Sequence, residues 1–428
     1  MWLVMNKSHL FGRISMNIPI SRKNIFSSVV ILFATLFSSV SVAGEWRYGP
    51  ELPGERHSHT ATRLSTGEVV VIGGEETGAV YLDSAIVFDP SGSTYVTATG
   101  RLHESRSHHT ATRLRDGRVL VVGGTASGGL ILDTAEIFDP ATGMFAEVGD
   151  RLNVGRIRHT ATRLPNGTVL ITGGVGSVDG GRPDLDSAEI FDPASESFRL
   201  LASRMSSARR GHTATPLRIR SGLYRGAVLI VGGTATYSTE LESDIYVPRR
   251  GRFEPGGSLV EGRSRHTATR IPPPPDDNPG RLPINVLIAG GNNSTNQAEI
   301  YDFWTRTFSL TDATTFNHEH HTATFLPGRK KTKTPPSVLI AGGRHYLGLV
   351  PDGSGGEVGA VGSLDASEEY SAWHHEWRYP GVLGTSRAYH TATRLTSGEV
   401  LVVGGYHFDG SDPEVITTAL NSTEIYTP

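Results

Sequence analysis

The stretch HTATRLRDGRVLVVGG, residues 109–124, contains the pattern that decides the fold. It begins with a His-Thr-Ala-Thr tetrad, passes through an Asp-Gly pair and ends in an apolar run followed by two glycines. Asp-Gly between two strand-like runs predicts a tight hairpin, because both turn residues must take positive φ. An apolar run without polar alternation predicts a strand that is covered on both faces. The stretch therefore predicts a hairpin whose second strand is buried.

The tetrad occurs seven times along the chain. Its histidine, which we call the tetrad histidine, stands at positions 59, 109, 159, 212, 266, 321 and 390. Spacings of 50 to 55 residues, and once of 69, indicate a repeat architecture rather than several unrelated domains.

Each repeat continues with two more predicted strands. The third carries an aromatic residue, at Phe88, Phe138, Phe191, Tyr246, Tyr301, Tyr370 and Tyr426. The fourth carries another, at Tyr95, Phe145, Phe198, Phe253, Phe308 and Trp377. The last repeat ends at Pro428 after its third strand and so lacks the fourth.

The missing fourth strand is found at the start of the repeat region. EWRYGPELPGERHSHTATRL, residues 45–64, has a twin in EWRYPGVLGTSRAYHTATRL, residues 376–395, so Trp46 corresponds to Trp377. We predict a ring in which residues 45–50 complete the sheet formed by residues 389–428. An open array would leave an unpaired strand edge at each end, which favours aggregation.

Seven units with an Arg three residues before the tetrad histidine, a Gly-Gly pair and two aromatic strands resemble the kelch family over residues 45–428. The resemblance implies an all-β fold, a seven-bladed β-propeller of four-stranded blades with the tetrad strand innermost around a central channel. Two repeats depart from the pattern. The fourth has Val247-Pro248 in place of Asp-Pro, and the sixth has His318 in place of the Arg.

Residues 1–43 have the features of a secretory signal peptide, with basic residues before an apolar run and a small-residue end at Ala43. An uncleaved anchor is the alternative, and Met16 is an alternative start. The expected mature chain, residues 44–428, is a single propeller in the periplasm or outside the cell, without membrane insertion after cleavage. With no cysteine it has neither disulfides nor a lipoprotein anchor. It keeps 36 Lys and Arg against 43 Asp and Glu, and this negative charge argues against a nucleic-acid partner.

Features shared by all repeats are expected to be architectural, so we predict that the tetrad histidines form local hydrogen bonds. The arginines three residues before them, which we call the blade arginines, are expected to surround one channel mouth and to bind an anionic ligand. In the alternative interpretation each one pairs with a neighbouring acid or carbonyl group. The blade arginines are Arg56, Arg106, Arg156, Arg209, Arg263 and Arg387.

Loops after the Gly-Gly pairs differ most between repeats, and the longest are in the sixth and seventh. Long loops on a rigid scaffold commonly carry binding sites. The predicted site therefore also includes His318, Arg344, His345, Tyr346, Tyr406, His407 and Asp409. No cofactor or metal is expected. One alternative makes His318 and His320 metal ligands, because they share a face if the segment is extended.

We predict a non-enzymatic binding module for a protein or glycan partner, with an anionic group in the ligand. The alternative is a carbohydrate-active enzyme, such as a sialic acid mutarotase or epimerase, although no catalytic residue is assigned. Sialic acid mutarotases resemble this chain as exported kelch propellers that act on an anionic sugar, but they have six blades. Galactose oxidase is also a kelch propeller, and its copper radical site needs a cysteine, which this chain lacks.

Overall fold

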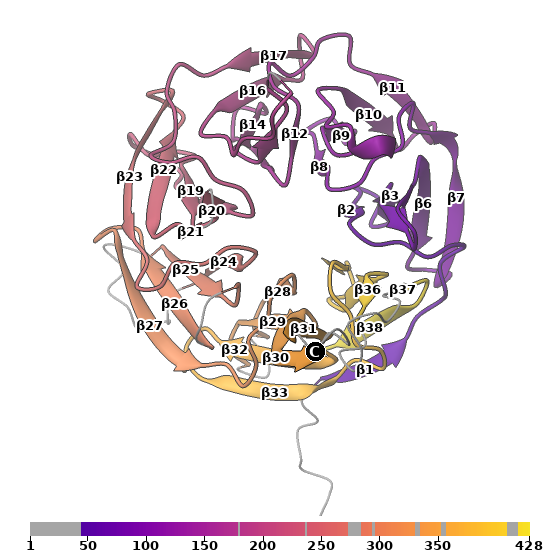
Figure 1. Ribbon diagram of the computed structural model, residues 1–428, viewed down its shortest axis with the longest axis vertical. Helices are drawn as coiled ribbons and strands as arrows, with labels where there is room; N and C mark the ends of the chain where they lie inside the picture. The colour runs from indigo at the N-terminus through magenta and orange to yellow at the C-terminus, as the bar shows by residue number, and fades with distance from the viewer. Residues whose placement is uncertain are drawn as a thin grey trace, which may run out of the picture. The chain divides into compact units, whose positions relative to one another are not determined.

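The computed structural model describes residues 44–428 except 179, 236–237, 273–283, 293–295, 330–333, 352–356 and 409–417. The signal peptide predicted at residues 1–43 lies outside the described residues. Seven four-stranded antiparallel sheets stand around a common centre (Figure 1). The predicted seven-bladed β-propeller is confirmed.

The blades are numbered in chain order, and their strands are given from the centre outward. Blade 1 contains β2 (Thr60–Arg63), β3 (Val69–Ile72), β6 (Ser84–Asp89) and β7 (Thr94–Arg101). Blade 2 contains β8 (Thr110–Arg113), β9 (Val119–Val122), β10 (Ala135–Asp139) and β11 (Met144–Glu147). Blade 3 contains β13 (Thr160–Arg163), β14 (Val169–Thr172), β16 (Ala188–Asp192) and β17 (Ser197–Leu200). Blade 4 contains β18 (Thr213–Pro216), β19 (Val228–Val231), β22 (Glu242–Val247) and β23 (Arg252–Ser258).

Blade 5 contains β24 (Thr267–Ile271), β25 (Asn285–Ala289), β26 (Gln297–Asp302) and β27 (Thr307–Ala313). Blade 6 contains β28 (Thr322–Leu326), β29 (Ser337–Ala341), β32 (Ala366–Ser371) and β33 (Trp377–Val382). Blade 7 contains β34 (Thr391–Arg394), β35 (Val400–Val403), β38 (Thr423–Thr427) and β1 (Glu45–Tyr48).

Short two-stranded ribbons accompany five of the blades. They are β4 (Glu75–Glu76) with β5 (Val80–Tyr81), β12 (Arg156–Ile157) with β15 (Val175–Gly176), β20 (Thr234–Ala235) with β21 (Ser238–Thr239), β30 (Arg344–Pro351) with β31 (Glu357–Ser363), and β36 (Tyr406–His407) with β37 (Thr418–Ala419). A single 3₁₀ turn, η1 (Ser127–Gly129), is assigned in the described part of the chain. No helix within that part is long and apolar enough to cross a bilayer.

The first strand closes the ring as predicted. β1 pairs antiparallel with β38 (Figure 1). In the register of these two strands Trp46 lies opposite Tyr426. The two rings are 5.0 Å apart at 46°, and Phe138 and Phe145 of blade 2 are 5.0 Å apart at 48°. Trp46 therefore occupies the same outer position as the fourth-strand aromatic residues of the other blades.

The hydrophobic core lies between neighbouring blades. The second strand of every blade is buried on both faces, and β9 is fully inaccessible to solvent. One cluster joins Val70 and Ile72 of blade 1 to Val119, Val121 and Phe138 of blade 2. Since each blade buries its apolar faces against its neighbours, the fold depends on closure of the ring.

The Gly-Gly pairs let each blade approach the next. Gly73 and Gly74 have φ of 59° and 102°, a region that favours glycine. A Cβ atom on Gly73 would lie 2.5 Å from the carbonyl oxygen of Arg106, while the Gly74 N–H donates to that oxygen at 2.9 Å. Any larger residue at Gly73 would separate blade 1 from blade 2.

Candidate functional site

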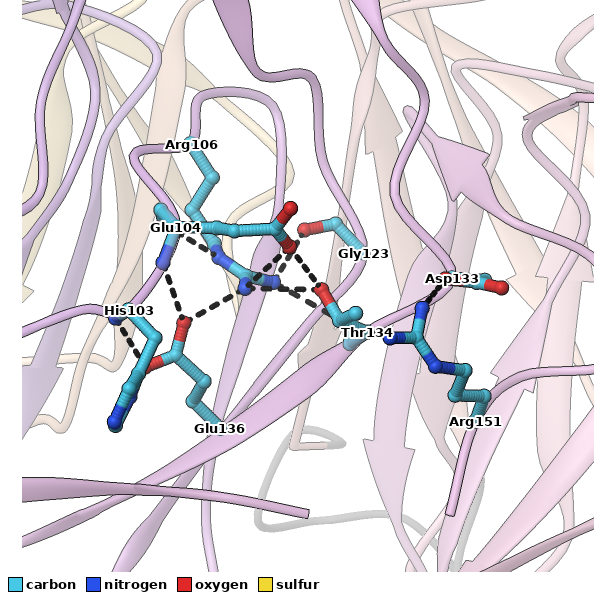
Figure 2. Close-up of polar contacts among 8 residues, drawn as sticks. All are labelled: His103, Glu104, Arg106, Gly123, Asp133, Thr134, Glu136 and Arg151. Carbon is cyan, nitrogen blue, oxygen red and sulfur yellow. Dashed lines mark hydrogen bonds and ion pairs between the residues drawn. The ribbon is translucent and has the colours of Figure 1, made fainter. Parts of the chain in front are cut away.

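The blade arginines lie inside the blades. The Arg106 side chain is fully buried, and its Nη2 lies 2.8 Å from Glu136 Oε1 (Figure 2). Its Nη1 donates to the Gly123 carbonyl at 2.9 Å. Glu136 also accepts the His103 backbone N–H at 2.9 Å. These contacts leave no free guanidinium edge for a ligand.

The same ion pair recurs in four other blades, between Arg156 and Glu189 at 2.6 Å, Arg209 and Asp244 at 3.2 Å, Arg263 and Glu299 at 2.8 Å, and Arg387 and Glu424 at 2.7 Å. In blade 6, His318 takes the place of the arginine. Its Nε2 lies 2.8 Å from Glu368 Oε2, and its Nδ1 lies 2.6 Å from the Gly342 carbonyl. His318 is therefore part of the blade interior.

Blade 1 lacks the carboxylate, because Ile86 stands where Glu136 stands in blade 2. Arg56 instead donates to the Gly73 carbonyl and to Ser84 Oγ, both at 3.2 Å. Burial lowers the pKa of Arg56 to about 10. The expectation that the blade arginines and His318 surround a ligand is thus corrected, because burial directs these groups to partners inside the blades. The alternative interpretation, pairing with acids or carbonyls, describes their contacts.

Replacing Glu136 with Gln should destabilise the protein by about 3 kcal/mol, because the buried Arg106 charge would lose its close counterion and keep only the partly exposed Glu104 at 3.9 Å. Asp133→Asn is the matched control. It breaks the exposed Asp133–Arg151 pair of the same blade (Figure 2), at a cost of less than about 1 kcal/mol. Urea denaturation of both variants measures the difference, and equal losses would contradict the structural role of the Arg106–Glu136 pair.

The tetrad histidines form a closed ring of hydrogen bonds between blades. His109 Nε2 lies 2.9 Å from Thr60 Oγ1 of the preceding blade, and His59 Nε2 completes the circle 3.0 Å from Thr391 Oγ1. The other contacts join His159 to Thr110, His212 to Thr160, His266 to Thr213, His321 to Thr267 and His390 to Thr322. Burial lowers the pKa of all seven imidazoles, to about 3 for His109. Neutral histidines that link blades fit the predicted architectural role.

The residue before each tetrad histidine forms a second closed ring, which we call the collar. Its members are Ser58, His108, Arg158, Gly211, Arg265, His320 and Tyr389, and all have positive φ between 52° and 62°. Each donates its N–H to the carbonyl of the member in the preceding blade, for example His108 to Ser58 at 3.1 Å and Ser58 to Tyr389 at 3.2 Å. The backbone is the same at all seven positions, and the side chains differ.

Six of the seven collar residues, all except Ser58, line a cavity of about 280 Å³, together with Arg210, Thr234, Ser264 and four tetrad histidines. An adjoining cavity of similar volume shares His108, Arg158, His320 and Tyr389 and extends to Ser58. Left-handed backbone at six non-glycine positions costs conformational energy, and such strain concentrates at functional sites. We therefore take the collar as the candidate site.

The candidate site carries an excess of positive charge. Arg265 and Arg344 both pair with Glu319, the latter at 2.9 Å, and Arg210 pairs with Asp184 at 3.0 Å. Arg158 is exposed, and no carboxylate of the described residues lies within ion-pair distance of it. Although part of the Arg158 side chain reaches solvent, the surrounding protein still desolvates the guanidinium and lowers its pKa. The charges of Arg265, Arg210 and Arg344 lower this pKa further, against the opposing effect of Tyr389. An anion bound at Arg158 would relieve this repulsion.

Glu319 is fixed as an anion. Burial opposes its ionisation, but the hydrogen bonds from Arg344 and Arg265 outweigh that effect, and its pKa is lowered. Burial also lowers the pKa of His108 to about 3, and that of His320 falls well below its usual value for the same reason. At neutral pH the site thus combines charged arginines with neutral imidazoles.

Aromatic rings form one wall of the site. Tyr389 stacks on His320 with 3.8 Å between ring centroids, and Phe408 lies 5.0 Å from Tyr406. The Arg344 guanidinium is 5.9 Å from both the Tyr389 and the Phe408 rings. Tyr389 lines both cavities, whereas Tyr406 and Phe408 lie beside them.

The long loops of the sixth and seventh repeats meet, since Phe408 N–H donates to Ser363 Oγ at 2.5 Å. Arg344 and Tyr406 do not line either cavity; Arg344 acts on the site through its pair with Glu319, and Tyr406 packs against Phe408. His345 is half-buried, and Tyr346 is 61% exposed on β30; neither lines the cavity.

His407 binds Ser386 Oγ through Nδ1 at 2.8 Å and also does not line the cavity. The prediction for Asp409 lies outside the described residues.

His318 and His320 do not share a metal-binding face. His320 has a φ of 55°, so the segment is not extended there and the expected alternation fails. His318 lies inside blade 6, whereas His320 stacks on Tyr389 at the collar. Among the described residues, no group of three or more His, Cys, Asp or Glu is placed to hold a metal ion.

The collar was missed in the sequence, although a signal for it existed. The position before the tetrad histidine changes in almost every repeat, while the tetrad itself is constant. Variation within an invariant frame is expected where a repeat protein binds its ligand.

Two solved structures are similar to this fold. A fungal alcohol oxidase of the AA5 family, in complex with copper, has 13% sequence identity and a TM-score of 0.65, covering 90% of this chain and 76% of its own. YjhT has 14% identity and a TM-score of 0.50, covering 88% and 96%. No family model and no curated protein matches the sequence. The neighbours and the seven blades fit a kelch-type propeller.

Proposed function

We propose that the collar binds a small ligand that carries a carboxylate and a flat or ring-shaped body, such as an acidic sugar. The main support for this proposal is the environment of Arg158. This side chain is exposed and has no carboxylate partner among the described residues. A guanidinium can bind a carboxylate through two parallel hydrogen bonds. The nearby charges of Arg210, Arg265 and Arg344 add to the attraction for an anion.

The rest of the site suits a monosaccharide-sized ligand. A cavity of about 280 Å³, with a similar one beside it, is near the lower limit of small-molecule pockets. Tyr389 places an aromatic ring at the wall of the cavity, and the neutral imidazole of His108 can exchange hydrogen bonds with hydroxyl groups. A predicted signal peptide at residues 1–43 would place this binding propeller in the periplasm or outside the cell, where glycans are available.

Binding is favoured over catalysis by the titration properties of the site. General acid–base catalysis works best with a group whose pKa lies near neutral pH. The pKa values of His108, His320 and Glu319 are all lowered, which makes each a poor proton donor and a weak base. The alternative, a mutarotase or epimerase acting on an acidic sugar, is tested by the same experiment.

Arg158→Ala should weaken binding of the acidic sugar at least ~10-fold, the loss expected for one charge-assisted hydrogen bond. Isothermal titration calorimetry with N-acetylneuraminic acid, glucuronic acid and neutral glucose provides the measurement. We expect binding of at least one acid and none of glucose. Arg199→Ala, which removes an exposed arginine from β17, is the matched control.

Equal affinity of the Arg158→Ala and Arg199→Ala variants, or binding of glucose alone, would overturn the proposal. Proton NMR of the same sugars follows anomer exchange. An exchange rate raised by the wild-type chain and restored to the background rate by Arg158→Ala would instead support the enzymatic alternative.

A further inference from the structure

The opposite ends of the innermost strands carry a third ring, which we call the arginine ring. It consists of the residues that follow the tetrad, Arg63, Arg113, Arg163, Arg270 and Arg394, with Pro216 and Phe325 at the two remaining positions. The innermost strands, such as β2 (Thr60–Arg63), run between the collar and the arginine ring, and four extended residues span about 10 Å. The arginine ring and the collar are therefore separate sites.

Two of the ring arginines, Arg63 and Arg163, are held by carbonyl groups of neighbouring blades. Arg63 Nη1 donates to the Arg394 carbonyl at 2.8 Å. Arg163 Nη1 donates to the carbonyls of Arg113 and Leu114, at 2.9 Å and 2.8 Å. These bonds fix the guanidinium groups in place but leave their charge uncompensated.

Carboxylates do not neutralise the arginine ring in the part of the chain that the structure describes. The ion pairs found there include none of its five arginines, nor Arg115, Arg218 or Arg220 beside them. Two carboxylates on the hairpins at this end have other partners, because Asp116 pairs with Arg118 and Glu399 pairs with Arg47.

The arginines at this end repel one another electrostatically. Burial lowers the pKa of Arg163, and the charges of Arg113 and Arg115 lower it further. The pKa of Arg270 falls through burial and the charges of Arg218 and Arg220. The Nε atoms of Arg270 and Arg394 are also buried without a hydrogen-bond partner. Donors and charge are thus both left unsatisfied at this end.

A cavity of about 800 Å³ opens among these side chains. Arg63, Arg113, Arg115, Arg163 and Arg218 line it, together with Pro165, and no acidic side chain does. The volume is within the range of small-molecule sites. Three of these lining arginines, Arg63, Arg113 and Arg163, belong to the arginine ring, and Arg115 and Arg218 lie beside it. The cavity is too large for a single inorganic anion to contact all five lining arginines.

We propose that the arginine ring binds a compact polyanion that carries several phosphate or sulfate groups. Tetrahedral oxyanions present several acceptor oxygens, and guanidinium groups bind them through paired hydrogen bonds. Several such groups on one molecule are needed to engage arginines of different blades. A ligand with a single carboxylate, as proposed for the collar, would leave most of the ring charge uncompensated.

The test is isothermal titration calorimetry of the full chain with inorganic tripolyphosphate, and with sucrose octasulfate as the sulfate arm. We expect binding that weakens as salt is raised, because surface ion pairs are screened. Arg113→Gln should weaken it ~10-fold, and adding Arg218→Gln should weaken it further by a similar factor. Tighter binding of one probe identifies the oxyanion that the site prefers.

Two controls define the result. Arg199→Gln removes a surface arginine and should leave binding unchanged, and so should Arg158→Ala, because it lies in the collar. Arg218→Gln alone affects an exposed side chain, so it retains the fold if Arg113→Gln does not. Absence of binding, or equal loss in the Arg199→Gln and Arg218→Gln variants, would overturn the proposal. Neither outcome affects the collar, whose ligand is measured separately.

Discussion

Lowering the pH from about 7 to about 5 should cause a steep loss of stability, because the seven tetrad histidines must remain neutral in the folded ring. Their pKa values in the folded protein are lowered, to about 3 for His109, His212, His266 and His390. In the unfolded chain they return to about 6.5. Between these values the unfolded state binds more protons, so stability is complete above pH 6.5 and falls as the pH decreases.

The expected size of this effect is large. Each histidine contributes up to about 1.4 kcal/mol per pH unit, and seven together contribute up to about 10 kcal/mol per pH unit. A typical folding free energy of about 5–15 kcal/mol would be consumed within two pH units. Thermal melting from pH 8 to pH 4.5 measures the fall.

The pH window separates the histidines from the acids. Asp and Glu side chains titrate mainly below pH 5, so a decline between pH 6.5 and pH 5 reports histidine. His109→Gln keeps a polar side chain that does not titrate, and it should reduce the slope in this window by up to about 1.4 kcal/mol per pH unit, the share of one histidine. A melting temperature that is constant from pH 7 to pH 5 would contradict neutral burial of the ring.

Removal of residues 44–50 should abolish the soluble folded state. The deletion takes away β1 and exposes the edge of β38, which then can pair with another chain. It also removes Trp46, which packs on Tyr426 and donates from Nε1 to Ser367 Oγ of blade 6 at 3.1 Å. We expect aggregation, measured by size-exclusion chromatography and light scattering.

Trp46→Ala tests the same closure more gently. Truncation of a packed aromatic residue costs about 3–5 kcal/mol, and Trp46 is only half-buried, so we expect the lower end of that range. Trp304, which is 40% exposed, provides the matched control as Trp304→Ala, with an expected loss below about 1 kcal/mol. Equal melting temperatures of the two variants would show that β1 contributes little to closure.

The fold could be predicted because every repeat contains the same sequence signals for its strands and turns. The hairpin signal, the buried second strand and the two aromatic positions all recur, and the strand count left one vacancy that Trp46 could fill. The structure places Trp46 opposite Tyr426, as that count requires. The strand pattern within each repeat and the pairing of the first strand with the last repeat therefore both predicted a closed ring of seven blades.

The site was harder to predict, because sequence position does not reveal which way a side chain points. The blade arginines lie two residues before the collar, yet they turn into the blades and meet the third-strand acids. The sequence did contain a sign of the acids that pair with the blade arginines. An acid stands at the position of Glu136 in six repeats, and Ile86 replaces it in the first. Pro53, which has no N–H, occupies the position from which His103 donates to Glu136. Donor and acceptor are thus absent together in blade 1.

The collar could not be deduced from strand periodicity, because its left-handed backbone interrupts the alternation of side chains. In an extended chain the side chains of His318 and His320 would point to the same side. Because His320 has a φ of 55°, the two side chains point in different directions. Tertiary contacts between blades determine this conformation through the ring of backbone hydrogen bonds. The sequence pattern of one strand does not predict hydrogen bonds between different blades.

The seven collar bonds are made by peptide groups alone, so the circumference that they define does not depend on which side chains project from it. None of the seven residues is β-branched, as the left-handed backbone demands. Within that limit, mutation can rewrite one position at a time while the scaffold stays constant. Related propellers can therefore differ in ligand preference through substitutions at the seven collar positions. A library randomised at these positions alone would yield variants with new ligand specificity on an unchanged fold.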